Sequence, residues 1–202
     1  MQTMKKFYIL LLLLPVLAWS CGDDEEDVLP NQQKKIISFL TSSHSPRLVA
    51  EKEVEQDSDQ PFYTDLGGSA FRYIDQYYNP DRVNWKEVTA ESKITITFSQ
   101  YLFNYRAITD RDLPFFSNDP DWEEILLKEG LTPGVWTFEP MEVDMAHPNV
   151  LNGLYQALLG CREGDIAEVY MCYNMAYGDD DNFGLIPKES PVAVFFTINS
   201  VE

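Results

Sequence analysis

Three segments near the end of the chain decide its fold: VLNGLYQALLGC (residues 150–161), GDIAEVYMC (164–172) and VAVFFTINSV (192–201). In the first segment, apolar residues recur at helical spacing, which predicts a helix that begins after Pro148 and Asn149. Its apolar face comprises Val150, Leu151, Leu154, Leu158 and Cys161. The other two segments alternate between two sets of side chains and therefore predict strands over 166–172 and 192–201.

Alternation also assigns the two faces of these strands. The core face carries Ala167, Val169, Met171, Val192, Val194, Phe196 and Ile198. Tyr170 and Phe195 then point to the outer face of the sheet, where a second element must cover their rings. We expect that cover to be a helix over residues 31–42, because Ile36, Phe39 and Leu40 share one of its faces.

The sheet extends upstream of these segments. Residues 94–98 alternate strictly, with Ile94, Ile96 and Phe98 toward the core, and the strand is predicted to continue through 101–103. An earlier strand is predicted over 71–78 from its aromatic residues, after an irregular polar connector at 43–61.

The stretch 104–139 is predicted to contain a further helix. Asp119 can cap it, Pro120 suits its first turn and Gly130 can end it. Its buried stripe comprises Trp122, Ile125 and Leu126. Because helices and strands do not alternate regularly along the chain, we expect an α+β fold with a mainly antiparallel sheet.

Composition limits the classes of partner. The chain has 202 residues, and its 33 acidic against 15 basic side chains give a net charge of -18. A surface this acidic repels the phosphates of nucleic acids and anionic lipid headgroups, so we expect no nucleic-acid partner. The hydrophobic content of 45% is typical of a globular chain, and the length suits one domain.

The N-terminus predicts export and a lipid anchor. Lys5 and Lys6 precede an apolar run over 7–18 that is too short to span a bilayer and is typical of a secretory signal. The run ends in Ala-Trp-Ser before Cys21, which resembles a bacterial lipobox with Ala in place of the usual Leu. Cys21 is the predicted lipidation site, and the alternative is an ordinary signal peptide with a chance cysteine. The acidic segment after Cys21 predicts a solvated tether over 21–30.

The standard catalytic motifs are missing from the sequence. His44 and His147 cannot make a three-histidine zinc site, and there is no nucleophile elbow or glycine-rich phosphate loop. The acidic run at 179–182 could attract calcium but lacks the pattern of a calcium loop, so a solvated turn is the favoured interpretation. We predict neither a metal site nor a cofactor.

The C-terminal third resembles the FKBP-type peptidyl-prolyl cis-trans isomerases. The resemblance rests on Val150-Leu151 with Gly153-Leu154, on Ala176-Tyr177-Gly178, on Ile186-Pro187 eight residues later, and on the final strand. It covers residues 140–202 and extends upstream to the strand at 94–98. It implies a twisted antiparallel sheet wrapped around one short helix, with an apolar pocket between them. Residues 71–202 would form this core, and 104–139 would be an enlarged loop with an extra helix.

The resemblance also implies a set of pocket residues. The predicted site comprises Tyr177, Phe98, Phe116, Val150, Leu151, Leu154 and Ile186. Tyr177 matches the family's ligand-binding tyrosine, and the backbone N–H of Leu151 would face the ligand. Phe98 replaces a tyrosine, Leu154 the tryptophan that floors the pocket, Val194 a phenylalanine and Met141 another aromatic wall. Phe116-Ser117 matches the family's Phe-Asp pair, so the pocket aspartate is lost.

Two further expectations follow from the implied fold. Cys161 lies on the core face of the helix and Cys172 on the outer face of its strand, so they are not expected to form a disulfide. Aromatic residues of the enlarged loop either fill the space left by the missing pocket aromatics or belong to an ordinary core, which is the favoured interpretation. They are Phe115, Trp122, Trp136 and Phe138.

Together these patterns predict an exported bacterial lipoprotein. Residues 1–20 are its signal peptide, and 31–202 form an FKBP-like domain with an N-terminal helical extension. We expect a monomeric prolyl isomerase or proline-binding folding helper that acts on proline-containing polypeptides at the outer membrane, displayed on the cell surface or else facing the periplasm. The alternative is a non-catalytic surface lipoprotein that binds a protein or glycan through the 104–139 insertion. Tyr177 favours the first function, and Leu154 favours the second.

Overall fold

A mixed sheet forms the centre of the protein. The computed structural model describes residues 27–180 and 186–202, so Cys21 and the predicted signal peptide lie outside the described residues. The sheet runs in the order β1-β2-β3-β7-β8-β4-β5, with β6 paired to β4 beyond this path. All of these strand pairs are antiparallel except β1 with β2. The strands are β1 (Val49–Ala50), β2 (Phe62–Asp65), β3 (Ala70–Ile74), β4 (Lys93–Leu102), β5 (Phe116–Ser117), β6 (Met141–Asp144), β7 (Ile166–Met171) and β8 (Val192–Val201).

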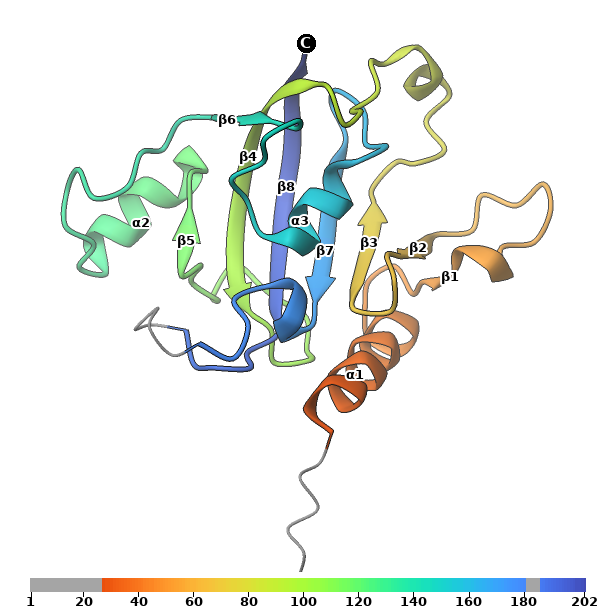
Figure 1. Ribbon diagram of the computed structural model, residues 1–202, viewed down its shortest axis with the longest axis horizontal. Coiled ribbons are helices and arrows are strands. Elements are labelled where there is room, and N and C mark those ends of the chain that lie inside the picture. The colour runs from red at the N-terminus through yellow and green to blue at the C-terminus, as the bar shows by residue number, and fades with distance from the viewer. Residues whose placement is uncertain (1–26, 181–185) are drawn as a thin grey trace, which may run out of the picture.

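Helices pack on both faces of this sheet. The helices are α1 (Val28–Ser42), α2 (Glu123–Lys128) and α3 (Asn152–Leu158), with 3-10 turns η1 (Glu51–Glu53), η2 (Pro80–Asn84), η3 (Pro120–Trp122) and η4 (Tyr173–Met175). The α3 helix packs on one face of the sheet and α1 on the other. In the view of Figure 1, α3 lies in front of β7 and β8, and the segment with α2 projects from the β5 edge. The α+β class and the FKBP-like architecture expected from the sequence are confirmed.

The main core lies between α3 and the sheet. A seven-residue helix is not stable alone in water, so α3 depends on burial of its apolar face. Leu154, Ala157 and Leu158 are at most 1% exposed and pack against core-facing residues of β4, β7 and β8. Gly153 permits this close approach, because a Cβ there would overlap the Sδ atom of Met171.

A second core lies on the opposite face, under α1. Ile36, Phe39 and Leu40 form one buried cluster with Tyr170, which is only 2% exposed, and Phe195 packs against that cluster. The ring centroids of Phe39 and Tyr170 are 5.3 Å apart. The prediction that α1 covers the outer face of the sheet is therefore confirmed.

Polar contacts fasten α1 to the same face. The Nε2 atom of Gln32 donates to the Glu189 carbonyl at 2.7 Å, and its Oε1 atom accepts from the Tyr173 N–H at 2.9 Å. Nε2 of His44 lies 2.9 Å from Glu168 Oε2, which also accepts from the Tyr170 hydroxyl at 2.6 Å. Because these side chains are enclosed, each hydrogen bond satisfies a group that would otherwise be costly to bury.

Several predicted boundaries need correction near the N-terminus. The first helix begins at Val28, so it includes the last part of the predicted 21–30 tether. The predicted connector at 43–61 contains the short strand β1, and β2 follows it unpredicted. Tyr77 and Tyr78 do not extend the β3 strand, because Gln76 adopts a positive φ of 54° and turns the chain away from the sheet.

The helix in the 104–139 insertion is shorter than expected. Asp119 does cap its start, accepting a hydrogen bond from the Asp121 N–H at 3.0 Å, but the first turn is the 3-10 turn η3. Leu126 is the buried residue of α2, whereas Ile125 is 42% exposed. The predicted stripe of Trp122, Ile125 and Leu126 is therefore wrong in part, because α2 lies beyond the sheet edge and only Leu126 is enclosed.

The cysteines agree with their predicted placement. Cys161 lies just beyond the end of α3 within the main core, and Cys172 lies in the second core across the sheet. Both are free and buried, so the prediction that they do not pair is confirmed. Within the described residues, no helix combines the length and apolarity needed to cross a membrane.

Candidate active site

A cavity of about 370 Å³ opens between the start of α3 and the β4–β5–β6 part of the sheet. We call it the α3 cavity. Its lining comprises Phe98, Gln100, Phe116, Met141, Asn149, Val150, Leu151, Leu154, Ala176 and Tyr177. The fold thus brings together every residue of the predicted site except Ile186.

Aromatic and aliphatic side chains make most of the lining. Leu154, 1% exposed, comes from α3, and Phe98, 2% exposed, from the facing strand β4. Phe116 on β5 packs edge-on against Phe98, with ring centroids 5.4 Å apart. Val150 and Leu151, which lead into α3, are half-buried. Such a lining can enclose a small apolar group and remove water from its surroundings.

Ile186 is placed elsewhere. It is 7% exposed and follows residues 181–185, which lie outside the described part of the chain. It is not among the described residues that line the α3 cavity. Val194, which the resemblance placed in the pocket wall, is fully buried in the main core and is also not one of those residues.

Tyr177 is the polar centre of the cavity. Its hydroxyl donates to Oε1 of Gln100 at 2.6 Å, and its ring packs edge-on against Phe115 at 5.8 Å. Burial raises the pKa of Tyr177 to about 12, so the hydroxyl keeps its proton at neutral pH and remains a donor.

Gln100 is a site residue that the sequence analysis missed. It lies on β4 two residues after Phe98, so it belongs to the same face as Ile94, Ile96 and Phe98. A polar residue in that apolar series was the available signal. Gln100 is only 5% exposed, and it fixes the orientation of the Tyr177 hydroxyl.

The backbone adds a second donor. Leu151 stands at the N-cap of α3, and its carbonyl accepts from the Tyr155 N–H at 2.9 Å. Within the described residues, its own N–H has no hydrogen-bond partner. A ligand carbonyl in the cavity could accept from this group, as the resemblance implies.

Ser117 and Asn118 tie the base of the insertion to the sheet instead of lining the cavity. Ser117 is fully buried, and its hydroxyl lies 2.8 Å from that of Ser99. Asn118 accepts from the Phe98 N–H at 2.6 Å and donates to the Ile96 and Glu139 carbonyls, both at 2.9 Å. The position matched to the family's pocket aspartate therefore has a structural role here.

The insertion aromatics divide into two groups. Phe115 packs against the main core, as the favoured interpretation expected. Trp136 and Phe138 belong to neither core cluster, so that interpretation is wrong for them. Their rings continue a row that starts at Phe116, with centroids 5.4 Å apart from Phe116 to Trp136 and 6.3 Å from Trp136 to Phe138. This row extends outward from the cavity rim. Trp122 is half-buried and also lies outside both clusters.

The described residues offer no site for a metal ion. No three His, Cys, Asp or Glu side chains in 27–180 and 186–202 are close enough to hold one. Of the acidic run at 179–182, Asp181 and Asn182 lie outside the described residues.

Sequence comparison finds a family match for the segment that contributes Met141, residues 149–151, Leu154 and Tyr177 to this cavity. Residues 134–199 match the profile of a family described as FKBP-type peptidyl-prolyl cis-trans isomerase. This part of the chain resembles the FKBP-type family, and the fold around it is FKBP-like. The match spans β6, α3, β7 and nearly all of β8, while β4 of the FKBP-type sheet and the 104–133 part of the insertion precede it. Among curated protein sequences, no relative was found.

Solved structures with the same fold are distant in sequence. The three FKBP domains of wheat FKBP73 are 16% identical, with a TM-score of 0.50, over 70% of this chain and 51% of that chain. The N-terminal domain of FKBP42 from Arabidopsis thaliana is 13% identical, with a TM-score of 0.44, over 74% of this chain and 96% of that chain. A peptidyl-prolyl cis-trans isomerase from Pseudomonas syringae pv. tomato is 12% identical, with a TM-score of 0.47, over 87% and 93%. At these identities, the wheat structure supports the FKBP-type fold alone.

Proposed function

We propose that the chain is a peptidyl-prolyl cis-trans isomerase whose catalytic site is the α3 cavity. The observation that carries the proposal is one apolar cavity that joins the Tyr177 hydroxyl, the Leu151 N–H and the side chains of Phe98 and Leu154. Rotation about an X-Pro bond needs no nucleophile and no metal. Its barrier of about 18–20 kcal/mol reflects lost amide resonance.

The cavity can lower this barrier by differential binding. Enclosing the amide among Phe98, Phe116 and Leu154 removes water, which favours the less polar twisted amide over the planar one. The Leu151 N–H can donate to a substrate carbonyl and hold one side of the bond while the other turns. For the Tyr177 hydroxyl to donate to substrate as well, it must leave Gln100, so Gln100 competes with the substrate for this proton.

The grip on the prolyl ring is expected to be weak. Leu154 supplies less surface than a tryptophan, a residue that typically buries 150–250 Å². The row of Phe116, Trp136 and Phe138 at the rim offers aromatic surface to residues that flank the proline. The proposed substrate is therefore an extended proline-containing polypeptide rather than a compact ligand.

The proposal includes a lipid anchor at Cys21 on the outer membrane, with display on the cell surface. The support is the lipobox-like sequence and the acidic tether behind it. Because α1 begins at Val28, the chain from Cys21 can span at most roughly 25 Å, so the folded domain would stay close to the membrane. We propose that the protein works there as a monomer.

A proline-limited refolding assay with the purified protein tests the catalytic proposal. The wild type should accelerate the slow phase, Tyr177→Phe should reduce the acceleration, and Leu154→Trp should increase it by restoring an aromatic floor. Tyr155→Phe is the matched control, because Tyr155 lies on α3 outside the cavity lining and should leave the rate unchanged. No acceleration by the wild type, with a gain in Leu154→Trp, would mean that the natural cavity is not catalytic.

The anchor has its own test. Metabolic lipid labelling should be lost in Cys21→Ala, and labelling that persists in this variant contradicts the lipobox. Protease added to intact cells should cleave the protein if it is displayed. Protection in intact cells, together with cleavage in lysates, would place it on the periplasmic side.

One observation favours the alternative function, a non-catalytic protein that binds its partner through the 104–139 insertion. Leu113, Ile125, Leu127 and Val135 of this segment are between 37% and 63% exposed. If this surface were the binding site, Ile125→Ser with Leu127→Ser would abolish binding to the partner, whereas Tyr177→Phe would not affect it.

A further inference from the structure

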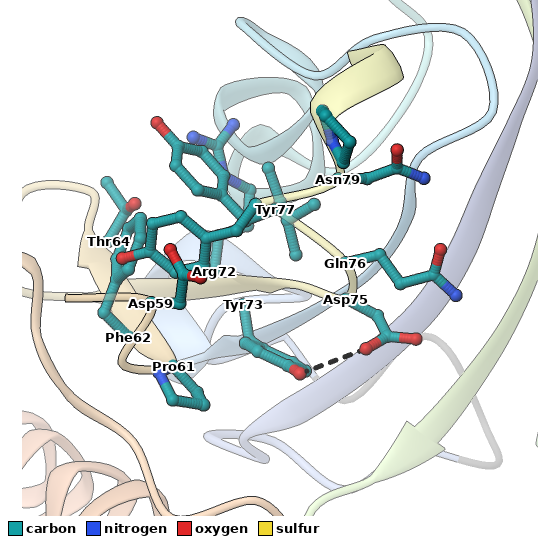
Figure 2. A pocket seen from close by; sticks show the side chains of 13 residues that line it. Asp59, Pro61, Phe62, Thr64, Arg72, Tyr73, Asp75, Gln76, Tyr77 and Asn79 are labelled. Carbon is teal, nitrogen blue, oxygen red and sulfur yellow. Dashed lines mark hydrogen bonds between the residues drawn. The ribbon is translucent and has the colours of Figure 1, made fainter. Parts of the chain in front are cut away.

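A larger cavity, of about 590 Å³, lies at the other end of the sheet from the α3 cavity. We call it the β2–β3 cavity, since Asp59, Pro61, Phe62, Thr64 and residues 72–80 line it (Figure 2). In the order of the strands, β7, β8 and β4 separate β3 from the β5 edge where the α3 cavity opens. Its volume is within the roughly 300–1,000 Å³ typical of small-ligand sites.

Aromatic rings form much of its wall. Phe62, Tyr77 and Tyr78 are mutual neighbours, with centroid distances of 4.8, 6.1 and 5.3 Å. Phe62 belongs to neither core cluster, and Tyr77 and Tyr78 are 38% and 37% exposed. The exposed rings of Tyr77 and Tyr78 therefore present apolar surface to the cavity, and the buried Phe62 ring packs behind them.

The wall is held rigidly. The guanidinium of Arg82 stacks on Tyr77 at 4.7 Å from the ring centroid and is itself fixed by a bidentate ion pair with Asp165. The Tyr78 hydroxyl donates to the Gln60 carbonyl at 3.2 Å, and Asn79 caps η2 by accepting from the Asp81 N–H. A ligand would meet a preorganised surface, so little ordering cost would be paid on binding.

Polar side chains of both kinds line the same space. Within the described residues, Asp59, Thr64 and Gln76 make no side-chain hydrogen bond, while Asp75 accepts from the Tyr73 hydroxyl at 3.2 Å (Figure 2). Arg72 is anchored through its guanidinium to the Ala157 and Leu159 carbonyls, yet its buried Nε has no partner among the described residues. The cavity thus combines free acceptors with free donors.

This combination selects a ligand class. Asp59 and Asp75, in a chain of net charge -18, oppose an anion. Arg82 already lies over the Tyr77 ring, and its positive charge disfavours a second cation there, whereas a neutral ligand is not repelled and Tyr77 remains 38% exposed. A proline-rich peptide has few N–H groups and would leave the carboxylates without a donor. A sugar satisfies all of these conditions, because its hydroxyls both donate and accept while its C–H face packs on an aromatic ring.

We propose that the β2–β3 cavity binds a neutral carbohydrate. Tyr77 and Tyr78 provide the stacking surface, and Asp59, Asp75 and Gln76 hydrogen-bond the hydroxyls. This site is separate from the proposed isomerase site and does not depend on that activity.

Calorimetric titration of the purified protein with neutral oligosaccharides tests the proposal. The probes are cellohexaose, maltohexaose, mannohexaose and xylohexaose, with decaproline as the peptide comparison. At least one oligosaccharide should bind at one site per chain. Tyr77→Ala and Tyr78→Ala should each weaken binding about tenfold, the effect of losing one aromatic contact. Asp59→Asn, an exposed change that should not affect folding, should weaken binding severalfold.

Two controls separate the cavities. Trp136→Ala removes an aromatic ring near the α3 cavity and should leave oligosaccharide affinity unchanged. Tyr77→Ala should leave the isomerase rate unchanged, so failure of one proposal is distinguishable from failure of the other. The carbohydrate proposal is overturned if none of the oligosaccharides binds, if affinity survives Tyr77→Ala and Asp59→Asn, or if decaproline binds here in their place.

Discussion

A buried ion pair allows a stringent test of how the fold is stabilised. Arg82 in η2 and Asp165, just before β7, form two hydrogen bonds, Nε to Oδ1 at 2.8 Å and an Nη atom to Oδ2 at 2.7 Å. The Asp165 side chain is fully buried, and its Oδ2 also accepts from the Arg162 N–H at 2.7 Å. Asp165→Ala therefore leaves the Arg82 charge and one backbone N–H without a partner.

The expected cost is large. Removing one partner of a buried pair typically destabilises a protein by about 3–5 kcal/mol, because the remaining charge stays desolvated. For a chain of this size, each kcal/mol lowers the melting temperature by roughly 2–4 °C, so Asp165→Ala should melt roughly 6–20 °C below the wild type. Replacing both members, as Arg82→Met with Asp165→Leu, should recover much of this loss since no isolated charge remains.

Thermal unfolding followed by circular dichroism measures these differences. The control is Glu124→Ala, which breaks the ion pair with Lys128 on α2, where the two side chains are 82% and 70% exposed. It should leave the melting temperature nearly unchanged. A shift for Asp165→Ala no larger than that of the control would refute the argument that this buried pair holds η2 to the sheet.

Three further predictions concern the packing around the sheet. Gly153→Ala should lower the urea midpoint, corresponding to about 1–3 kcal/mol, because its Cβ would overlap the buried Met171 side chain; an unchanged midpoint would mean that the core accepts the methyl group. For His44, burial lowers the pKa, but the hydrogen bonds to Glu168 and to a backbone carbonyl outweigh it, so the net pKa is raised. The stability that protonated His44 adds to the folded state is complete below the unfolded pKa of about 6.5 and is lost as pH rises through the folded pKa. His44→Gln should therefore cost more stability at about pH 5.5 than at about pH 8.5, and an equal or reversed difference in urea titrations would contradict the assignment. Burial raises the pKa of the Cys161 thiol to about 12, so an aromatic disulfide reagent near neutral pH should modify it only after unfolding, and rapid labelling of the native protein would contradict its burial.

The strands β7 and β8 of the main sheet could be predicted because each packs against a different hydrophobic core on either face. β8 was predicted over 192–201 and has those bounds, since its alternate residues face two different cores. The same alternation predicted that Tyr170 and Phe195 need a cover, and α1 provides it. Local pattern and burial agree wherever a strand packs on both faces.

Prediction failed where long-range contacts decide the structure. β1 has two residues and pairs with a strand twelve or more positions away, so no local period marks it. The pattern of α2 is amphipathic, yet Ile125 has nothing to pack against beyond the sheet edge. The turn at Gln76 depends on one positive φ angle that the aromatic residues after it do not reveal.

The candidate site was predicted in part. Its residue types come from segments that the family resemblance aligns, and the fold gathers most of them around the α3 cavity. The partner of Tyr177 was missed, because the resemblance assigns no role to Gln100. The role of Trp136 depends on the path of the insertion, which the sequence pattern does not define.

The central claim is that the α3 cavity catalyses rotation about X-Pro bonds, and exchange spectroscopy of a short X-Pro peptide tests it most directly. Uncatalysed isomerisation takes tens to hundreds of seconds at 25 °C. Micromolar protein should bring cis and trans signals into measurable exchange, and Tyr177→Phe should slow this exchange while Tyr155→Phe does not. Exchange that stays at the uncatalysed rate with the folded wild-type protein would contradict the account.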